Sequence, residues 1–330
     1  MEKLKITQFV DPACTWCWGS SPIMRALEYR YGEQIEICYT MCGMIDDIRT
    51  FSNRRLDIGG DIEMSNRNMM KAWLEASQVH GMPVEEHHFH LFSEERTSTI
   101  PLNLAYIAAK QCCERGSDGR RNITKANRYL RRLQEATAVE AMHTNDIDVL
   151  VDLSAVLGFE PNRFREEIEG TRVREKYEND CERCRAYGVE STPTYLLEYK
   201  GEELILQGFT TCETLERNIK QFTYDALVLH KREQSGRERL SLNRNNVKDY
   251  IQRYGTVYPV EIATAFSLER YSGKSALNIE SYRNLPDVIE ELLKAELIGI
   301  TPQGNGFQIY DIKEKLTDTQ RRERQYAGTF

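Results

Sequence analysis

The spacing of apolar residues changes twice within the first forty residues. Residues 4–10 alternate apolar and polar side chains, as a short strand does. Residues 20–31 then place their apolar side chains at helical spacing, and residues 34–41 return to alternation. The pattern predicts a strand, a helix and a second strand that runs parallel to the first.

A helical insert is predicted from about residue 59 to residue 188. Its long periodic segments are 64–80, 100–115, 123–142 and 163–187. Thr144-Asn145-Asp146 is typical of a helix start, Gly158 of a helix end, and Pro161 of the first turn of the next helix. No comparable strand is predicted between these segments.

Two further strands are predicted over residues 188–197 and 202–209, with a closing helix over 211–222. Pro193 opens the first of these strands, where no ladder donor is needed. These elements complete an α/β core over residues 1–224.

The last third of the chain has a different organisation. Residues 225–243 are charged and weakly patterned, as a linker or a solvated helix is. Over residues 244–313 the pattern predicts helices at 246–254, 259–266 and 286–297, then a hairpin of 298–302 and 306–310. Residues 314–330 form a polar tail.

Composition and the start of the chain indicate the cellular compartment. The chain has 330 residues, 40% of them apolar, and a net charge of -7, which gives no general attraction to phosphates. No apolar run approaches the roughly 20 residues that span a bilayer. The start of the chain runs directly into the first strand and leaves no room for a signal peptide. We therefore expect a cytoplasmic protein, in which structural disulfides are rare.

The nine cysteines are then read as thiols. Cys14 and Cys17 lie where the first strand turns into a helix, and the first helical turn stabilises a thiolate. We expect Cys14 to be the more exposed, attacking sulfur, and Cys17 to resolve a mixed disulfide. The alternatives are half of a metal site or two buried cysteines.

The other cysteines give weaker signals. Cys38 is expected to fill the core, and so are Cys112 and Cys113, which are neighbours in the sequence. The same holds for Cys42, although a resolving role stays open because it lies near the active end of the sheet.

Cys181 and Cys184 lie on one face of a predicted helix and have three interpretations. In the first interpretation, both are core positions. In the second, they form a second dithiol that relays electrons to Cys14 and Cys17. In the third, they complete a four-cysteine zinc site with that pair.

His87, His88 and His90 form a short cluster after Gly81-Met82-Pro83. The cluster has no cysteine or carboxylate at ligand spacing, so we expect a solvated loop and no metal site.

A family resemblance rests on separated features that fall in one order. They are Cys14-x-x-Cys17 after a strand, a long helical insert, Gly188-Val189-x-x-Thr192-Pro193 before a hairpin, and Gly208-Phe209 before a final helix. This order resembles the thioredoxin superfamily over about residues 1–224. The stretch Asp11-Pro12-x-Cys14-x-Trp16-Cys17-Trp18-Gly19 is similar to its cytosolic DsbA and FrnE-like branch.

The resemblance implies a thioredoxin-like fold with a helical insertion and a cis peptide bond before Pro193, opposite the dithiol. It also implies that Thr192 and Pro193 hold an extended substrate segment while Cys14 attacks its disulfide. Trp16 and Trp18 are expected to contact the substrate too. Two departures remain: no histidine stands between the cysteines, and residues 41–45 match no family motif.

Three helices followed by a hairpin resemble a winged-helix domain. Relatives of this kind often bind DNA through a recognition helix. The helix in that place carries Asp287, Glu290, Glu291 and Glu296 against Lys294 alone, so it would meet phosphates with like charge. We therefore expect protein docking or dimerisation in preference to DNA binding.

The first functional hypothesis is a cytoplasmic thiol-disulfide oxidoreductase or isomerase that acts on protein or peptide disulfides. It needs no metal or organic cofactor, since the dithiol carries the electrons. The second is a DsbA-like, redox-responsive adaptor that binds a partner protein with little or no turnover. The third is a fold stabilised by zinc.

Overall fold

The computed structural model describes residues 2–114, 123–224 and 241–313 of the chain. Contacts divide it into two compact units. The first unit comprises Met1–Ser21, Glu33–Ser77 and Val84–Thr211, and the second Pro22–Gly32, Gln78–Pro83 and Cys212–Phe330. The domain boundaries expected from the sequence stay predictions.

The first unit is built on a four-stranded sheet with the order β2-β1-β3-β4. Its strands are β1 (Leu4–Val10), β2 (Ile35–Met41), β3 (Thr194–Tyr199) and β4 (Glu202–Gln207). β1 pairs in parallel with β2, as predicted, and antiparallel with β3. The parallel register sets Val10 beside Met41, so both strands end at the same edge.

The helix α1 (Thr15–Tyr31) follows β1 after four residues and passes from the first unit into the second. In the first unit, the Gln8 side chain donates a hydrogen bond to the Ser20 hydroxyl, and both residues are buried. This contact ties the start of α1 to the face of β1 that carries Ile6, Gln8 and Val10. The short 3-10 helix η1 (Gly32–Gln34) then leads into β2.

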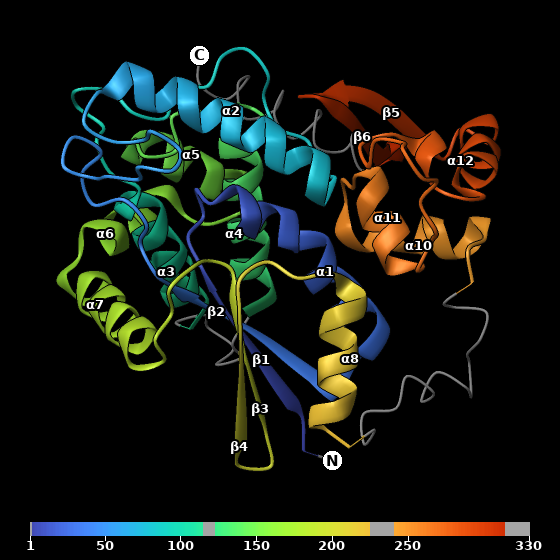
Figure 1. Ribbon diagram of the computed structural model, residues 1–330, viewed down its shortest axis with the longest axis horizontal. Coiled ribbons are helices and arrows are strands. Elements are labelled where there is room, and N and C mark those ends of the chain that lie inside the picture. The colour runs from blue at the N-terminus through green and yellow to red at the C-terminus, as the bar shows by residue number, and fades with distance from the viewer. Residues whose placement is uncertain (1, 115–122, 225–240, 314–330) are drawn as a thin grey trace. The chain divides into compact units, whose positions relative to one another are not determined.

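The helical insert is present, as predicted. It comprises α2 (Ile62–His80), α3 (Ile100–Glu114), α4 (Ile123–Ala138), α5 (Ile147–Val156), α6 (Pro161–Glu169) and α7 (Thr171–Ala186). In the first unit α3 packs against α4, α6 and α7, and α7 packs against β2. Figure 1 shows α3, α6 and α7 on one side of the strands.

Two helix predictions in the insert are corrected by the structure. The single segment 163–187 is two helices, because the chain leaves helical geometry at Gly170, which is extended at φ −71° and ψ 145°. The segment 123–142 ends at Ala138, because the chain turns through Ala141 at φ +49°. Asp146 caps α5 through its side chain, and Pro161 opens α6, as predicted.

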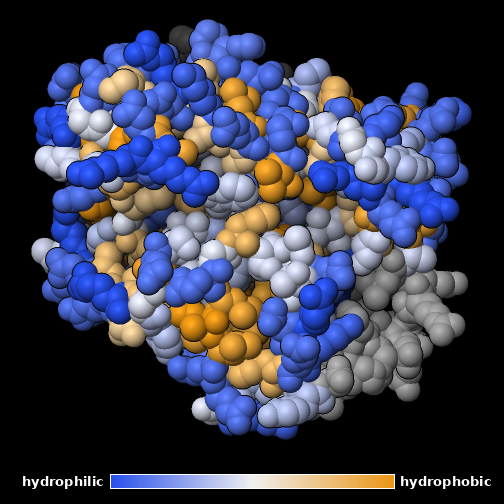
Figure 2. Space-filling view, viewed as in Figure 1, coloured by the Kyte–Doolittle hydropathy of each residue, from blue (hydrophilic) through white to orange (hydrophobic). Residues whose placement is uncertain are grey.

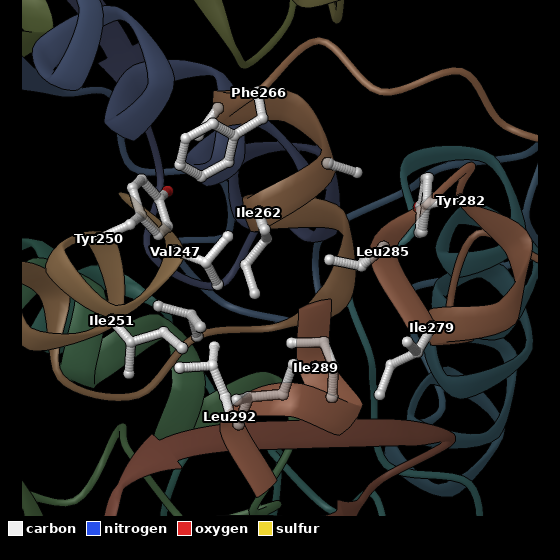
Figure 3. Packing of buried hydrophobic residues seen from close by; sticks show 14 of the residues in the cluster. Val247, Tyr250, Ile251, Ile262, Phe266, Ile279, Tyr282, Leu285, Ile289 and Leu292 are labelled. Carbon is white, nitrogen blue, oxygen red and sulfur yellow. The ribbon is translucent and has the colours of Figure 1, made fainter. Parts of the chain in front are cut away.

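The second unit contains α8 (Cys212–Phe222), α10 (Arg244–Tyr254), α11 (Pro259–Ala265), η3 (Ile279–Ser281), α12 (Leu285–Lys294) and a hairpin of β5 (Ile298–Gln303) and β6 (Gly306–Asp311). Its core gathers side chains from α10, α11 and α12, as Figure 3 shows. Ala26 and Tyr29 of α1 join this cluster, and Tyr29 meets Tyr250 edge to face at 5.1 Å. The later half of α1 is therefore part of this core.

The three helices and the hairpin of the second unit occur in the predicted order, and the likeness to a winged helix stays a prediction. The proposed linker 225–243 falls mainly outside the described residues, as does the tail 314–330. Among the helices the structure describes, none combines the length and the apolar character needed to span a membrane.

Candidate active site at the start of α1

Cys14 occupies the position directly before the first residue of α1. Its N–H donates to the Asp11 carbonyl at 3.0 Å, and its own carbonyl accepts from the Trp18 N–H at 3.0 Å. Cys17 lies one turn further into the helix. Cys14 is 5% exposed and Cys17 2% exposed, so both residues are buried, and the greater exposure expected of the Cys14 sulfur stays a prediction.

The segment that precedes β3 lies against this sulfur. The Cys14 Sγ is 3.4 Å from the Thr192 carbonyl oxygen, in hydrogen-bond contact. The Thr192–Pro193 peptide bond is cis. The fold therefore joins the two motifs on which the family resemblance rests, the dithiol and the Thr192-Pro193 segment.

The two thiols have opposite electrostatic surroundings. The hydrogen bond from the Cys17 thiol lowers the pKa of Cys14, burial acts against it, and contacts with Thr192 and the Cys17 backbone lower it further. Burial raises the pKa of Cys17 well above its ordinary value, and the contact with Cys14 raises it further. Of the two thiols, Cys14 is thus the more readily ionised.

The two tryptophans of the motif differ in position. Trp16 is half-buried, and its ring lies 5.2 Å from the ring of Phe209, so part of its surface borders the site. Trp18 is 1% exposed, and the Arg131 guanidinium lies 4.0 Å from its ring centre. The expectation that Trp18 contacts substrate is corrected, because its side chain is enclosed in the core.

Asp11 is a member of this site that sequence reasoning did not single out. Its fully buried carboxylate accepts hydrogen bonds from the Ala13 N–H at 2.7 Å and the Met44 N–H at 2.6 Å. It also accepts from the Thr99 hydroxyl at 3.1 Å and the Asn103 amide at 3.0 Å. Burial raises the pKa of Asp11, and these hydrogen bonds oppose that shift. Asp11 therefore joins the Cys14 loop to the segment after β2 and to α3.

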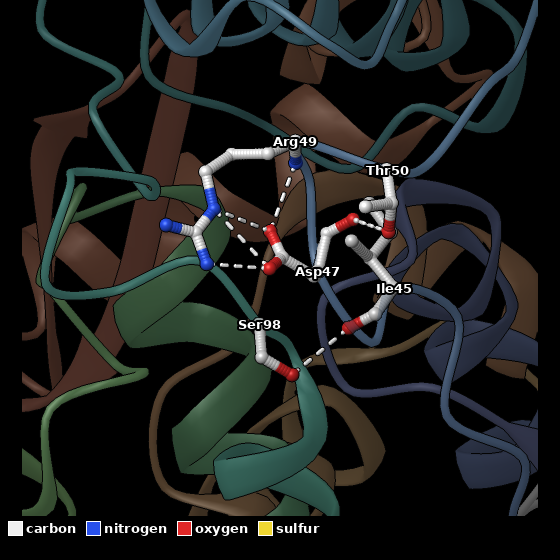
Figure 4. A network of polar contacts seen from close by, with 5 residues as sticks. All are labelled: Ile45, Asp47, Arg49, Thr50 and Ser98. Atoms are coloured by element: carbon white, nitrogen blue, oxygen red, sulfur yellow. Dashed lines mark hydrogen bonds and ion pairs between the residues drawn. The ribbon is translucent and has the colours of Figure 1, made fainter.

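The segment after β2 forms one border of the site. The Ile45 N–H donates to the Thr99 hydroxyl at 3.1 Å, and the Ile45 carbonyl accepts from the Ser98 hydroxyl at 3.0 Å. Further along, the Arg49 guanidinium binds both carboxylate oxygens of Asp47, as Figure 4 shows. These contacts hold the segment that exposes Met44 beside the anchored Asp11.

Hydrophobic side chains gather on the first unit beside this framework. In Figure 2 they cover the lower middle of the view, where Figure 1 places the strands β1, β3 and β4. Of the β4 side chains, Leu204, Ile205 and Leu206 are only half-buried. Leu204 and Leu206 lie on one face of β4 and Ile205 on the other, so both faces of this strand, which pairs with β3, carry half-buried apolar side chains.

The other cysteines of the chain lie outside the Cys14–Cys17 motif. All nine cysteines belong to the described residues, and none of them forms a disulfide. Cys184 is packed in a core cluster, whereas Cys181 is half-buried. In the described part of the chain, no three His, Cys, Asp or Glu side chains are grouped to hold a metal ion.

The minor predictions have mixed outcomes. Cys113 is buried, as expected of core filling, whereas Cys38 and Cys112 are only half-buried. His87, His88 and His90 are exposed in a loop, as predicted.

Comparisons with known proteins place the fold. The thioredoxin family model matches residues 8–217. A putative protein disulfide isomerase from Nitrosomonas europaea superposes with a TM-score of 0.56 and 15% identity, covering 68% of this chain and all of that one. The cytosolic disulfide reductase DsbM from Pseudomonas aeruginosa gives a TM-score of 0.50 and 20% identity over 67% of this chain and 100% of that one. At these identities the likeness establishes a DsbA-type thioredoxin-like fold.

Curated relatives carry a different name. The ClpXP adapter protein SpxH of Halalkalibacterium halodurans is 20% identical over 269 residues, which are 81% of this chain and 79% of the relative. The SpxH of Bacillus subtilis is 20% identical over 225 residues, 67% of this chain and 68% of the relative. The match to H. halodurans SpxH exceeds the length of the family-model match, which ends at residue 217.

Proposed function

This chain belongs to the thioredoxin family, and on that premise we propose that it is a thiol-disulfide oxidoreductase or isomerase of the cytoplasm. Its substrates are protein or peptide disulfides. The observation that carries the proposal is the contact between the Cys14 thiol and the Thr192 carbonyl at the start of α1. The structural likeness to DsbM, a cytosolic disulfide reductase, supports the compartment.

In the proposed reaction Cys14 is the nucleophile. Its thiolate attacks one sulfur of the substrate disulfide, the substrate S–S bond breaks, and the departing substrate sulfur takes up a proton. The product is a mixed disulfide between Cys14 and the substrate. The positive end of α1 and the lowered pKa of Cys14 make the attacking thiolate easier to form than that of an ordinary cysteine.

Cys17 completes the exchange. Its raised pKa keeps it protonated while the Cys14 thiolate is present. Once Cys14 is bound in the mixed disulfide, that negative charge is gone and Cys17 loses its proton more easily. Cys17 then attacks the Cys14 sulfur, and the second substrate thiol leaves. The two protein thiols supply both electrons, so the proposed step uses no metal or organic cofactor.

Thr192 and Pro193 position the substrate in this proposal. An extended substrate segment pairs with the backbone of Thr192 beside the Cys14 sulfur. Trp16 borders the same place and supplies apolar contact.

Reduction of insulin disulfides tests the proposal. The wild-type protein is expected to accelerate reduction by dithiothreitol, and Cys14→Ser is expected to return the rate to that of the reagent alone. Cys17→Ser is expected to accumulate a mixed disulfide with insulin, because the resolving thiol is absent. Cys38→Ser serves as the matched control, since Cys38 lies on β2 outside the site. Turnover that persists in Cys14→Ser would refute the assignment.

A second candidate function is that of an adaptor protein, favoured by the name of the SpxH relatives and the length of the match. In this proposal the chain binds a partner protein, and the second unit contributes the docking surface. The acidic exposed side chains of α12 disfavour DNA as that partner.

A binding experiment separates the two functions. The full chain is mixed with purified ClpXP, and complexes are resolved by size-exclusion chromatography. A redox-responsive adaptor is expected to bind stoichiometrically, and the variant Cys14→Ser/Cys17→Ser, which cannot be oxidised at this pair, is expected to bind as the reduced wild type does. Absence of a complex, combined with insulin turnover, would exclude the adaptor function and retain the oxidoreductase function.

A further inference from the structure

Three cysteines outside the Cys14–Cys17 pair meet at the end of β2. Cys42 directly follows β2, and its N–H donates to the Val10 carbonyl at 2.9 Å. Cys181 and Cys184 lie one turn apart on α7, which packs against β2. The Cys181 Sγ lies 4.0 Å from the Cys42 carbonyl oxygen, and the Cys184 Sγ lies 3.9 Å from that of Met41. One helix face thus brings two thiols to the segment that carries a third.

Cys42 and Cys184 belong to one apolar cluster. Cys184 is a buried member of it together with Phe9 and Leu196, and Cys42 packs against these residues. Cys184 is buried and Cys42 is half-buried, so a reagent in solution reaches the pair from the Cys42 side. Two cysteines that pack in one cluster, with one of them accessible, are candidates for a disulfide, which needs the two Cα atoms within about 7 Å of each other.

Tyr177 distinguishes Cys181 from Cys184. Its hydroxyl is hydrogen-bonded to the Cys181 thiol, so Cys181 has another partner on its own helix. The Tyr177 ring also lies over Gly43, where an added Cβ would come within 1.7 Å of the hydroxyl oxygen. Cys184 belongs to the apolar cluster that Cys42 packs against, whereas Cys181 is not one of its members, so Cys184 is the α7 thiol that faces the Cys42 side chain.

The surroundings of this pair differ from those of Cys14. Contact with Cys184, followed by burial, raises the pKa of Cys42, whereas the pKa of Cys14 is lowered. The Cys42 thiol is therefore less readily ionised than the Cys14 thiol.

We propose that Cys42 and Cys184 are a second redox pair, oxidised by a small-molecule disulfide of the glutathione class. The Cys42 sulfur attacks one sulfur of the oxidised reagent, whose S–S bond breaks and releases one reduced thiol. The Cys184 sulfur then attacks the Cys42 sulfur and displaces the second reagent thiol. Two protein thiols become one disulfide, and one reagent disulfide becomes two thiols.

The expected consequence is a covalent link between α7 and the segment after β2. That segment also holds Met44, whose N–H donates to the Asp11 carboxylate. Oxidation of the second pair therefore fixes one border of the Cys14 site. The proposal does not depend on turnover at Cys14.

Peptide mapping of the full chain tests this proposal. The protein is incubated with oxidised glutathione, remaining thiols are alkylated, and the chain is digested with trypsin without reduction. Cleavage after Arg183 separates Cys181 from Cys184, and tandem mass spectrometry distinguishes Cys42 from Cys38 in their shared peptide. A Cys42–Cys184 link is expected in the wild type and in Cys14→Ser/Cys17→Ser.

Single substitutions complete the test. Cys42→Ser and Cys184→Ser are each expected to abolish the link, whereas the matched variant Cys181→Ser is expected to retain it. Thermal unfolding of each variant is measured alongside, so that loss of the link is read only from folded protein. A link from Cys42 to Cys181, a link that needs Cys14, or no link in the folded wild type would overturn the proposal.

Discussion

The Cys14 sulfur lies 3.4 Å from the Thr192 carbonyl oxygen, although 178 positions of sequence separate the two residues. The parallel pairing of β1 with β2 and the antiparallel pairing of β1 with β3 set this contact, because Phe9 stands opposite Thr194. Thr192 lies two residues before Thr194, and Cys14 lies five residues after Phe9. The Thr192 carbonyl therefore comes to lie beside the Cys14 thiol. The site is thus a consequence of strand register.

Asp11 provides the first prediction. Replacing it by Asn leaves the volume unchanged but presents an NH₂ group where the carboxylate accepts hydrogen bonds. We expect Asp11→Asn to lower the free energy of unfolding by about 1–3 kcal/mol, measured by urea denaturation at neutral pH. The control Asp152→Asn, at an exposed position of α5, is expected to change it by less than about 0.5 kcal/mol.

The same carboxylate predicts a pH dependence. Burial raises the pKa of Asp11 above its ordinary 3.8, so the folded protein binds this proton more tightly than the unfolded chain. The stability of the wild type relative to Asp11→Asn is therefore expected to fall as the pH rises from 3.8 through the folded-state pKa. A difference that stays constant or grows over this interval would contradict the assignment of the shift to burial.

Gly43 tests the packing of the segment after β2. It lies at φ +59°, and an added Cβ would approach the Tyr177 hydroxyl to 1.7 Å. We expect Gly43→Ala to destabilise the protein by about 2–4 kcal/mol, from backbone strain and displacement of Tyr177. Gly188→Ala is the matched control, because Gly188 has the same φ of +59° with no atom within 4 Å of the added Cβ.

For Gly188→Ala only the backbone strain applies, and the expected loss in the free energy of unfolding is about 1 kcal/mol. Tyr177→Ala in the Gly43→Ala background is expected to remove the steric part, so the two substitutions should not add. Equal effects at Gly43 and Gly188 in chemical denaturation would show that Tyr177 does not cover Gly43.

Arg30 tests the polar contacts within the second unit. Its buried guanidinium pairs with Glu216 at 2.7 Å and donates to the carbonyls of Ala265 and Thr264. Arg30→Met is expected to destabilise the protein by about 2–4 kcal/mol, because it leaves a partly buried carboxylate and two carbonyls without this donor.

The control for that substitution is Arg217→Met on α8. Arg217 pairs with Glu213 at 3.1 Å, and both side chains are exposed. Exposed pairs of this kind contribute less than about 1 kcal/mol. Similar losses for the two variants in urea denaturation would argue against a structural role for the buried Arg30.

The sequence predicted much of this fold because local signals agree with the tertiary structure. Alternation defines β1 and β2, and Asp146 and Pro161 mark helix starts that the structure contains. The break at Gly170 escapes prediction because the apolar periodicity continues past it. Helical spacing alone does not report a single extended residue.

The site was predicted where one motif carries it and missed where distant residues complete it. Cys14, Cys17 and the cis bond before Pro193 belong to motifs that are visible in the sequence. Asp11 stands in the same motif, but its partners Thr99 and Asn103 come from α3 and the loop before it. The shared packing of Cys42 and Cys184 likewise depends on how α7 packs on β2.

The thiolate at position 14 is the central claim, and the pH dependence of its alkylation tests it most directly. Reduced protein is treated with iodoacetamide from about pH 4 to about pH 10, and labelling at Cys14 is followed by mass spectrometry. The midpoint is expected below the ordinary thiol value of 9.0 in the wild type, and to move up in Cys17→Ala, which removes the principal hydrogen bond. A wild-type midpoint at or above 9.0, unchanged by Cys17→Ala, would contradict the account.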